Sequence, residues 1–154
     1  MKILIGIICI AMCTFFGYLL SNKYIRRKKY FNDFYLFNKN LQTELNFSKS
    51  SILKIIEDFS EKNSDFYYFI TKYFKKKNEE VNLSYLSSDE KDSAKKYLGS
   101  ISTVDDKTLI GYVNGYSQKL SEMLELSVRE EKKYKTLYIK LGFLFGLIIF
   151  IVLI

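Results

Sequence analysis

Residues 3–20 read ILIGIICIAMCTFFGYLL, an uninterrupted apolar stretch near the start of a chain of 154 residues. As an α-helix this stretch would extend for about 27 Å, close to the roughly 30 Å of a bilayer's hydrocarbon core. Only Lys2 precedes it, several cations follow it, and no A-x-A site ends it, so the pattern is not that of a cleaved secretory signal. Met12 before Cys13 likewise argues against a lipoprotein signal. We predict a retained transmembrane helix over residues 1–20.

A second apolar stretch stands at the other end, where residues 141–154 read LGFLFGLIIFIVLI. The stretch is short for a span, but residues 137–139 extend its apolar face, and Lys140 can reach the lipid headgroups with its ammonium group. A soluble domain of this size could not surround such a helix with protein. We predict a second transmembrane helix over residues 137–154.

Most of the excess positive charge lies beside these two stretches. The chain carries 24 Lys+Arg against 17 Asp+Glu. Juxtamembrane cations favour the cytoplasmic side of a bilayer, so residues 21–136 are expected to form a cytoplasmic body between the spans. Because the body itself is acidic, membrane lipid is the expected partner and nucleic acid is not. The cations predicted at the membrane interface are Lys23, Arg26, Arg27, Lys28, Lys29, Lys132, Lys133, Lys135 and Lys140.

The composition argues against most enzyme chemistry. The chain has no His and only two Cys, so it lacks an imidazole base and the usual ligands of a zinc or redox-metal site. Paired acids such as Glu130 and Glu131 fall where solvated helix faces are expected. Cys9 and Cys13, one turn apart in the first span, are interpreted as packing residues, with a disulfide or lipidation as alternatives. We expect no catalytic residue, no cofactor and no metal.

The body carries apolar residues at helical spacing. Capping residues and breakers divide it into short segments. The predicted helical segments are residues 31–45, whose stripe Asn38 interrupts; residues 52–59, capped by Ser50 or Ser51; residues 66–74; and a segment that opens with a capping box of Ser87 and Glu90 and is interrupted at Gly99.

A longer helix is predicted from a second capping box, formed by Thr103 and Asp106. Beyond it, apolar residues recur at steps of three and four as far as Val128, the spacing of a seam against another helix. Only Gly111 and Gly115 could break this helix before the second span. Since both ends of the chain return to the same bilayer, we predict an all-α fold: an antiparallel helical bundle between an N-terminal and a C-terminal transmembrane helix.

Two further features indicate contacts. Gly142 and Gly146 form a G-x-x-x-G motif, which could let membrane helices approach closely. An aromatic stripe on the body is interpreted as core or as a surface that faces a partner, because so small a bundle cannot hide all of its rings. The candidates for partner docking are Phe66, Phe69, Ile70, Tyr73 and Phe74.

The chain also resembles the stage III sporulation protein AB family of endospore-forming bacteria, from end to end. Residues 141–147 (LGFLFGL) are similar to the family's L-G-F-L-x-G-L. Residues 44–52 resemble its E-I-x-Y-G-x-T-P-L, with serine in place of the glycine and the proline. Residues 27–30 resemble its R-P-R/K-Q without the proline, and Leu98-Gly99 followed by Asp106 is similar to its hydrophobe-Gly pair and acidic residue.

The resemblance implies a function that spacing alone does not. The family is part of a mother-cell complex that joins the forespore through a channel, and its body is similar to the cytoplasmic domain of platform proteins in type II secretion and type IV pilus machines. The chain would then be a non-enzymatic scaffold in the mother-cell membrane that couples a secretion-type ATPase, stage III sporulation protein AA, to other channel subunits. The alternative is a self-associating membrane anchor or regulatory scaffold, a homo-oligomer unrelated to secretion.

Overall fold

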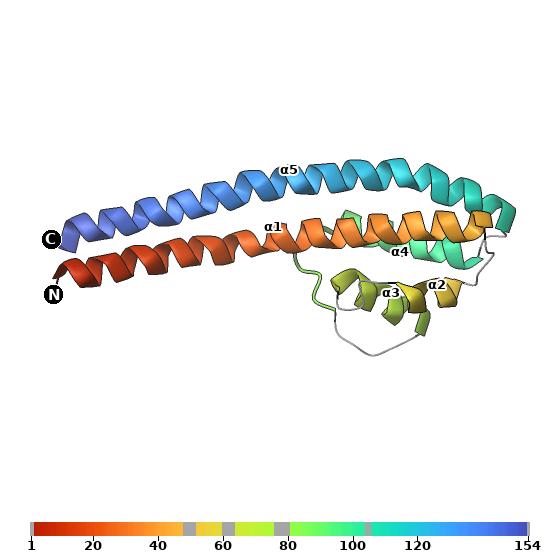
Figure 1. Ribbon diagram of the computed structural model, residues 1–154, viewed down its shortest axis with the longest axis horizontal. Coiled ribbons are helices and arrows are strands. Elements are labelled where there is room, and N and C mark those ends of the chain that lie inside the picture. The colour runs from red at the N-terminus through yellow and green to blue at the C-terminus, as the bar shows by residue number, and fades with distance from the viewer. Residues whose placement is uncertain (1, 48–51, 60–63, 76–80, 104–105, 154) are drawn as a thin grey trace. The chain divides into compact units, whose positions relative to one another are not determined.

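The computed structural model describes residues 2–47, 52–59, 64–75, 81–103 and 106–153. Within these residues there are five α-helices and no strand: α1 (Lys2–Phe47), α2 (Ile52–Asp58), α3 (Asp65–Lys75), α4 (Ser88–Thr103) and α5 (Asp106–Leu153). The predicted all-α class is confirmed (Figure 1). The chain divides into two compact units, to which α1 and α5 both contribute. We call Met1–Lys28 with Leu126–Ile154 the helix pair, and Lys29–Glu125 the body.

The helix pair consists of the N-terminal part of α1 and the C-terminal part of α5. The two run side by side in opposite directions, so that the start of α1 and the end of α5 lie together (Figure 1). Both helices are long and apolar enough to cross a bilayer. Their outward side chains are exposed, among them Phe15 at 59%, Phe145 at 62% and Ile151 at 72%. Water would make so much exposed apolar area costly, so the pair has the surface of a membrane protein.

The body is built around aromatic side chains from α1, α3 and α4. The ring of Phe34 stacks on Phe66 with 4.7 Å between centroids, and it meets the ring of Tyr97 edge-on at 5.0 Å. Each large apolar side chain buried in this way contributes about 1.5–3 kcal/mol to folding. The α5 segment closes this core with Leu109, Val113 and Leu120, all of them buried.

Asn38 interrupts the apolar stripe of α1 because it is the polar centre of this core. Its side chain is fully buried. Its Oδ1 accepts a 2.6 Å hydrogen bond from the Tyr97 hydroxyl of α4, and its Nδ2 donates to the Val113 carbonyl of α5 at 3.3 Å. One amide therefore links three helices of the body, and the break in the apolar pattern marks a contact rather than the end of a helix.

Side-chain caps fix where the short helices begin. The Glu90 N–H donates to Ser87 Oγ at 3.2 Å while the Ser87 N–H donates to Glu90 Oε2 at 2.9 Å, so the predicted capping box is present. Ser64 caps α3, since its Oγ accepts from the Tyr67 N–H at 3.1 Å. The predicted caps Ser50 and Ser51 lie outside the described residues.

The predicted interruption at Gly99 is wrong, because α4 continues to Thr103. Glycine costs a helix only about 1 kcal/mol relative to alanine, and burial of Leu98 and Ile101 on either side offsets that cost. Thr103 ends α4, where its hydroxyl donates to the Gly99 carbonyl at 3.0 Å. Thr103 therefore belongs to α4, whereas the sequence placed it in a capping box at the start of α5. Residues 104–105 lie outside the described residues.

Helix α5 passes through Gly111 and Gly115 without a break. No atom of another described residue lies within 4 Å of where a Cβ would stand at either glycine, apart from the helix's own backbone and chain neighbours. Both positions are exposed, so the glycines neither admit a neighbour nor end the helix.

Candidate functional site

The two halves of the helix pair approach each other closely at glycines. A Cβ on Gly142 would lie 2.5 Å from the Cys13 carbonyl oxygen, and a Cβ on Gly146 would lie 2.7 Å from the Ile10 Cα. Only hydrogen fits at these positions unless a backbone moves, as at other close crossings of membrane helices. The G-x-x-x-G motif thus lies against α1, within the same chain.

The α1 side of this crossing also carries glycines, which the sequence analysis did not single out. Gly17 faces the Tyr138 carbonyl, and Gly6 faces the Phe150 ring. These two glycines are separated by about three helical turns, so they lie on one face of α1. That spacing was the signal available in the sequence, and it is weaker than the G-x-x-x-G of α5.

A layer of tyrosines follows the glycines along the helix pair. The rings of Tyr24 and Tyr134 stack with 4.4 Å between centroids, and the Tyr138 ring lies 6.2 Å from that of Tyr24. The ammonium of Lys23 lies 5.0 Å from the Tyr24 centroid, and that of Lys133 lies 5.4 Å from the Tyr134 centroid. Tyrosine in such a layer is typical of a membrane–water interface.

Ion pairs form the next layer, and they involve the predicted interface cations Arg27, Lys28 and Lys135. Arg27 pairs with Glu130. Glu131 accepts a hydrogen bond from Lys28 at 3.5 Å and forms an ion pair with Lys135 at 3.8 Å. Glu130 and Glu131 are therefore not merely solvated acids, as the sequence analysis expected, because they link α5 to α1. The Glu131 side chain is only 15% exposed.

The other predicted interface cations differ in exposure and in the unit to which they belong. Arg26 is half-buried in the helix pair, and Lys29 is exposed but belongs to the body. Of the predicted interface cations, those exposed in the helix pair are Lys23, Lys132, Lys133 and Lys140.

The predicted docking residues separate into core and surface. Phe66 and Ile70 are fully buried and offer no surface, because they face α1 on the inner side of α3. We withdraw these two from the docking surface. Phe69 and Phe74 are half-buried against the core, whereas Tyr73 is 42% exposed. The periodicity of the stripe therefore located the buried face of α3, and the docking candidates lie along its edge.

The exposed edge of α3 forms a groove with α4. This groove has a volume of about 430 Å³ and is lined by Phe69, Lys72, Tyr73 and Lys95. The aromatic rings supply its apolar wall, and the exposed lysines stand at its rim. Lys95 lies 3.6 Å from the Asp92 carboxylate, a fully solvated pair that is worth little energy. We call it the α3–α4 groove. Its chemistry suits an apolar side chain with acidic neighbours.

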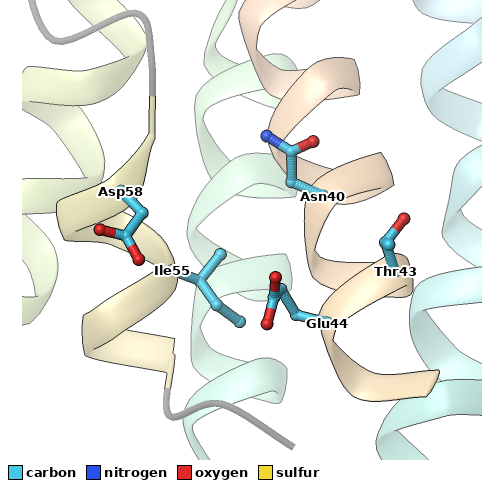
Figure 2. Close-up of a pocket in the computed structure, with 5 residues that line it drawn as sticks. All are labelled: Asn40, Thr43, Glu44, Ile55 and Asp58. Carbon is cyan, nitrogen blue, oxygen red and sulfur yellow. The ribbon is translucent and has the colours of Figure 1, made fainter. Parts of the chain in front are cut away.

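A second hollow lies between α1 and α2. Figure 2 shows Asn40 and Glu44 reaching from α1 toward α2, with Ile55 reaching back from α2. The hollow has a volume of about 200 Å³, and Thr43 and Asp58 complete its lining. Two carboxylates and two neutral polar groups give this part of the body an acidic surface. We call it the α1–α2 pocket.

The titratable groups of the body contribute to structure. Burial raises the pKa of Tyr30 and of Tyr97 above the ordinary tyrosine value, so both phenols stay protonated in alkaline solution in which an exposed tyrosine ionises. At the surface, a 2.8 Å hydrogen bond to Glu57 raises the pKa of Lys75. Among the described residues, no cluster of three or more His, Cys, Asp or Glu could hold a metal ion.

Fold and surfaces together define a class of protein: a small helical body joined to an antiparallel pair of apolar helices with a membrane-protein surface. The chain belongs to the stage III sporulation protein AB family, whose family model matches residues 2–154. Comparison with curated proteins and with solved structures gives no match. The family membership implies a role in stage III of sporulation.

Proposed function

We propose that this chain is a non-enzymatic platform subunit of the sporulation channel between mother cell and forespore. In this role, the helix pair anchors the chain in the mother-cell membrane. The body faces the cytoplasm, where it couples a secretion-type ATPase, stage III sporulation protein AA, to the other channel subunits. Membership of the stage III sporulation protein AB family supports a role in sporulation.

The α3–α4 groove is the observation that carries the docking part of the proposal. Tyr73 remains 42% exposed although its neighbours on α3 enter the core. The Tyr73 hydroxyl lies beside Gly99 of α4, where a Cβ would stand 3.4 Å from it, an ordinary contact distance. The ring is thus held at the surface by its packing, where a partner can bury it.

The acidic α1–α2 pocket supplies a second contact of opposite charge. Its carboxylates, Glu44 and Asp58, stand on either side of the buried Ile55. A basic side chain of the ATPase fits this arrangement, since lysine and arginine bind carboxylates through charge-assisted hydrogen bonds.

Co-purification from detergent-solubilised membranes tests the proposal. The full chain should recover the ATPase, and Phe69→Ala with Tyr73→Ala should lower that recovery at least about tenfold, as expected when anchoring aromatics are removed. Tyr68→Ala is the matched control, since Tyr68 is an exposed α3 aromatic outside the groove. Charge reversal by Glu44→Lys with Asp58→Lys should also lower recovery while membrane insertion persists.

Each outcome has a distinct meaning. If the groove and pocket variants recover as much ATPase as the unmodified chain, neither surface is the docking site. If the unmodified chain recovers only copies of itself and no ATPase, the coupling proposal fails and the self-associating anchor is favoured.

A further inference from the structure

The tyrosine layer of the helix pair holds two cations in an arrangement that the proposed function does not use. Tyr24 of α1 stacks on Tyr134 of α5, and the ammonium groups of Lys23 and Lys133 lie about 5 Å from the centroid of the ring that follows each in sequence. The two lysines come from different helices, and each lies beside its own ring of the stack. Both side chains are exposed.

The neighbouring carboxylates do not neutralise these lysines. Among the described residues of the helix pair, the ion pairs of Glu130 and Glu131 are with Arg27, Lys28 and Lys135. Lys23 and Lys133 lie against tyrosine rings, and Lys23 also has a side-chain hydrogen bond with Tyr24. An ammonium has three N–H donors, so neither lysine has all of its donors occupied by these contacts. Two uncompensated cations therefore remain beside the stack.

The depth of this layer decides which anion can reach it. Along the pair it lies between the glycine crossing, where Gly17 meets the Tyr138 carbonyl, and the ion pair of Arg27 with Glu130. The first of these belongs to the apolar stretch and the second to its polar flank. A layer in that position stands at the level of the lipid headgroups, where tyrosine and lysine are both favoured.

We propose that Lys23, Lys133 and the Tyr24–Tyr134 stack form a binding site for the headgroup of an anionic phospholipid. The two ammonium groups would donate hydrogen bonds to phosphate oxygens, and the exposed edges of the rings would contact the glycerol region of the lipid. The site joins α1 to α5, so the bound lipid would favour the paired state of the helices. This inference does not depend on the ATPase coupling or on the side of the membrane that the body faces.

Native mass spectrometry of the full chain tests the site directly. The chain is released from micelles doped with phosphatidylglycerol or with phosphatidylcholine, and the bound lipids are counted. The unmodified chain should retain phosphatidylglycerol preferentially. Each juxtamembrane cation is worth a factor of about five in affinity, so Lys23→Gln with Lys133→Gln should reduce that retention about 25-fold. Lys23→Arg with Lys133→Arg should restore it.

A control variant separates a site from the effect of net charge. Lys96→Gln with Lys119→Gln removes the same charge from the body, and Lys119 also lies over a tyrosine ring, 5.2 Å from the Tyr116 centroid. This variant should keep its phosphatidylglycerol. Helical circular dichroism should be unchanged in all variants, and a large excess of inorganic phosphate should not displace the lipid.

Three results would overturn the inference. One is undiminished phosphatidylglycerol binding by the Lys23→Gln, Lys133→Gln variant. Another is an equal loss in the body control, which would reduce the effect to net charge. The third is displacement of the lipid by inorganic phosphate, which would mean that the lysines bind a soluble anion instead.

Discussion

The Tyr97 hydroxyl donates a 2.6 Å hydrogen bond to the side-chain oxygen of Asn38 inside an otherwise aromatic core. The same amide donates to the Val113 carbonyl, and Gln42 Nε2 donates to that carbonyl at 3.4 Å. A buried polar group is costly unless its partners are in place, so this small network favours one arrangement of α1, α4 and α5 over shifted ones.

Removal of the Tyr97 hydroxyl should destabilise the body. In Tyr97→Phe the ring packing stays, but Asn38 Oδ1 loses its donor, and a buried acceptor without a donor costs about 1–3 kcal/mol. Tyr112→Phe is the matched control, because Tyr112 stacks on Tyr97 and its hydroxyl makes no hydrogen bond to any described residue. Chemical unfolding of the detergent-solubilised chain, monitored by circular dichroism, measures the free energy of unfolding of both variants. An equal loss in the two variants would contradict the role of Asn38.

Alanine should have opposite effects at two glycines of α5. Gly142→Ala places a Cβ 2.5 Å from the Cys13 carbonyl oxygen, so the helix pair should lose about 1–3 kcal/mol from overpacking. Gly111→Ala meets no neighbour and should stabilise the helix by up to about 1 kcal/mol. Thermal unfolding in micelles compares the two variants. Stabilisation by Gly142→Ala would show that α1 and α5 do not cross at this glycine.

Stability should fall in alkaline solution. Burial raises the pKa of Tyr30 and Tyr97 in the native state, whereas unfolded tyrosine titrates near pH 10. Above about pH 10 the unfolded state therefore binds fewer protons than the native state, and each buried tyrosine removes about 1.4 kcal/mol of stability per pH unit. The stability that the two buried phenols contribute is complete below about pH 10 and is lost as the pH rises above it.

The unfolding free energy measured from about pH 9 to pH 11 checks this dependence. Tyr97→Phe should show a shallower decline than the unmodified chain, since one of the two buried phenols is gone. An identical decline in both proteins would mean that Tyr97 is accessible to solvent in the native state.

Features that depend on neighbouring residues in the chain could be predicted from the sequence. The capping box of Ser87 with Glu90 and the helical stripe of Phe66 and Ile70 are both local patterns, and the structure contains both. The apolar stretches at the two ends are local as well, and they form the ends of α1 and α5.

Features that depend on which helices meet could not be predicted in this way. Asn38 looked like a break in a stripe, because its donor Tyr97 and its acceptor Val113 are distant in the sequence. The α3 stripe indicated the apolar face of the helix but not which of its residues lie at the exposed edge, so the core residues Phe66 and Ile70 were assigned to docking. The close approach at Gly17 could be recognised only from the Tyr138 carbonyl that faces it in the structure.

The central claim is that two apolar helices cross the membrane with the body on the cytoplasmic side. Its most direct test is labelling of a single cysteine in the body, with Cys9→Ser and Cys13→Ser removing the native thiols and Lys96→Cys placing a new one on the exposed face of α4. An impermeant maleimide applied to intact cells should leave this cysteine unlabelled until the membrane is permeabilised. Labelling in intact cells would contradict the account.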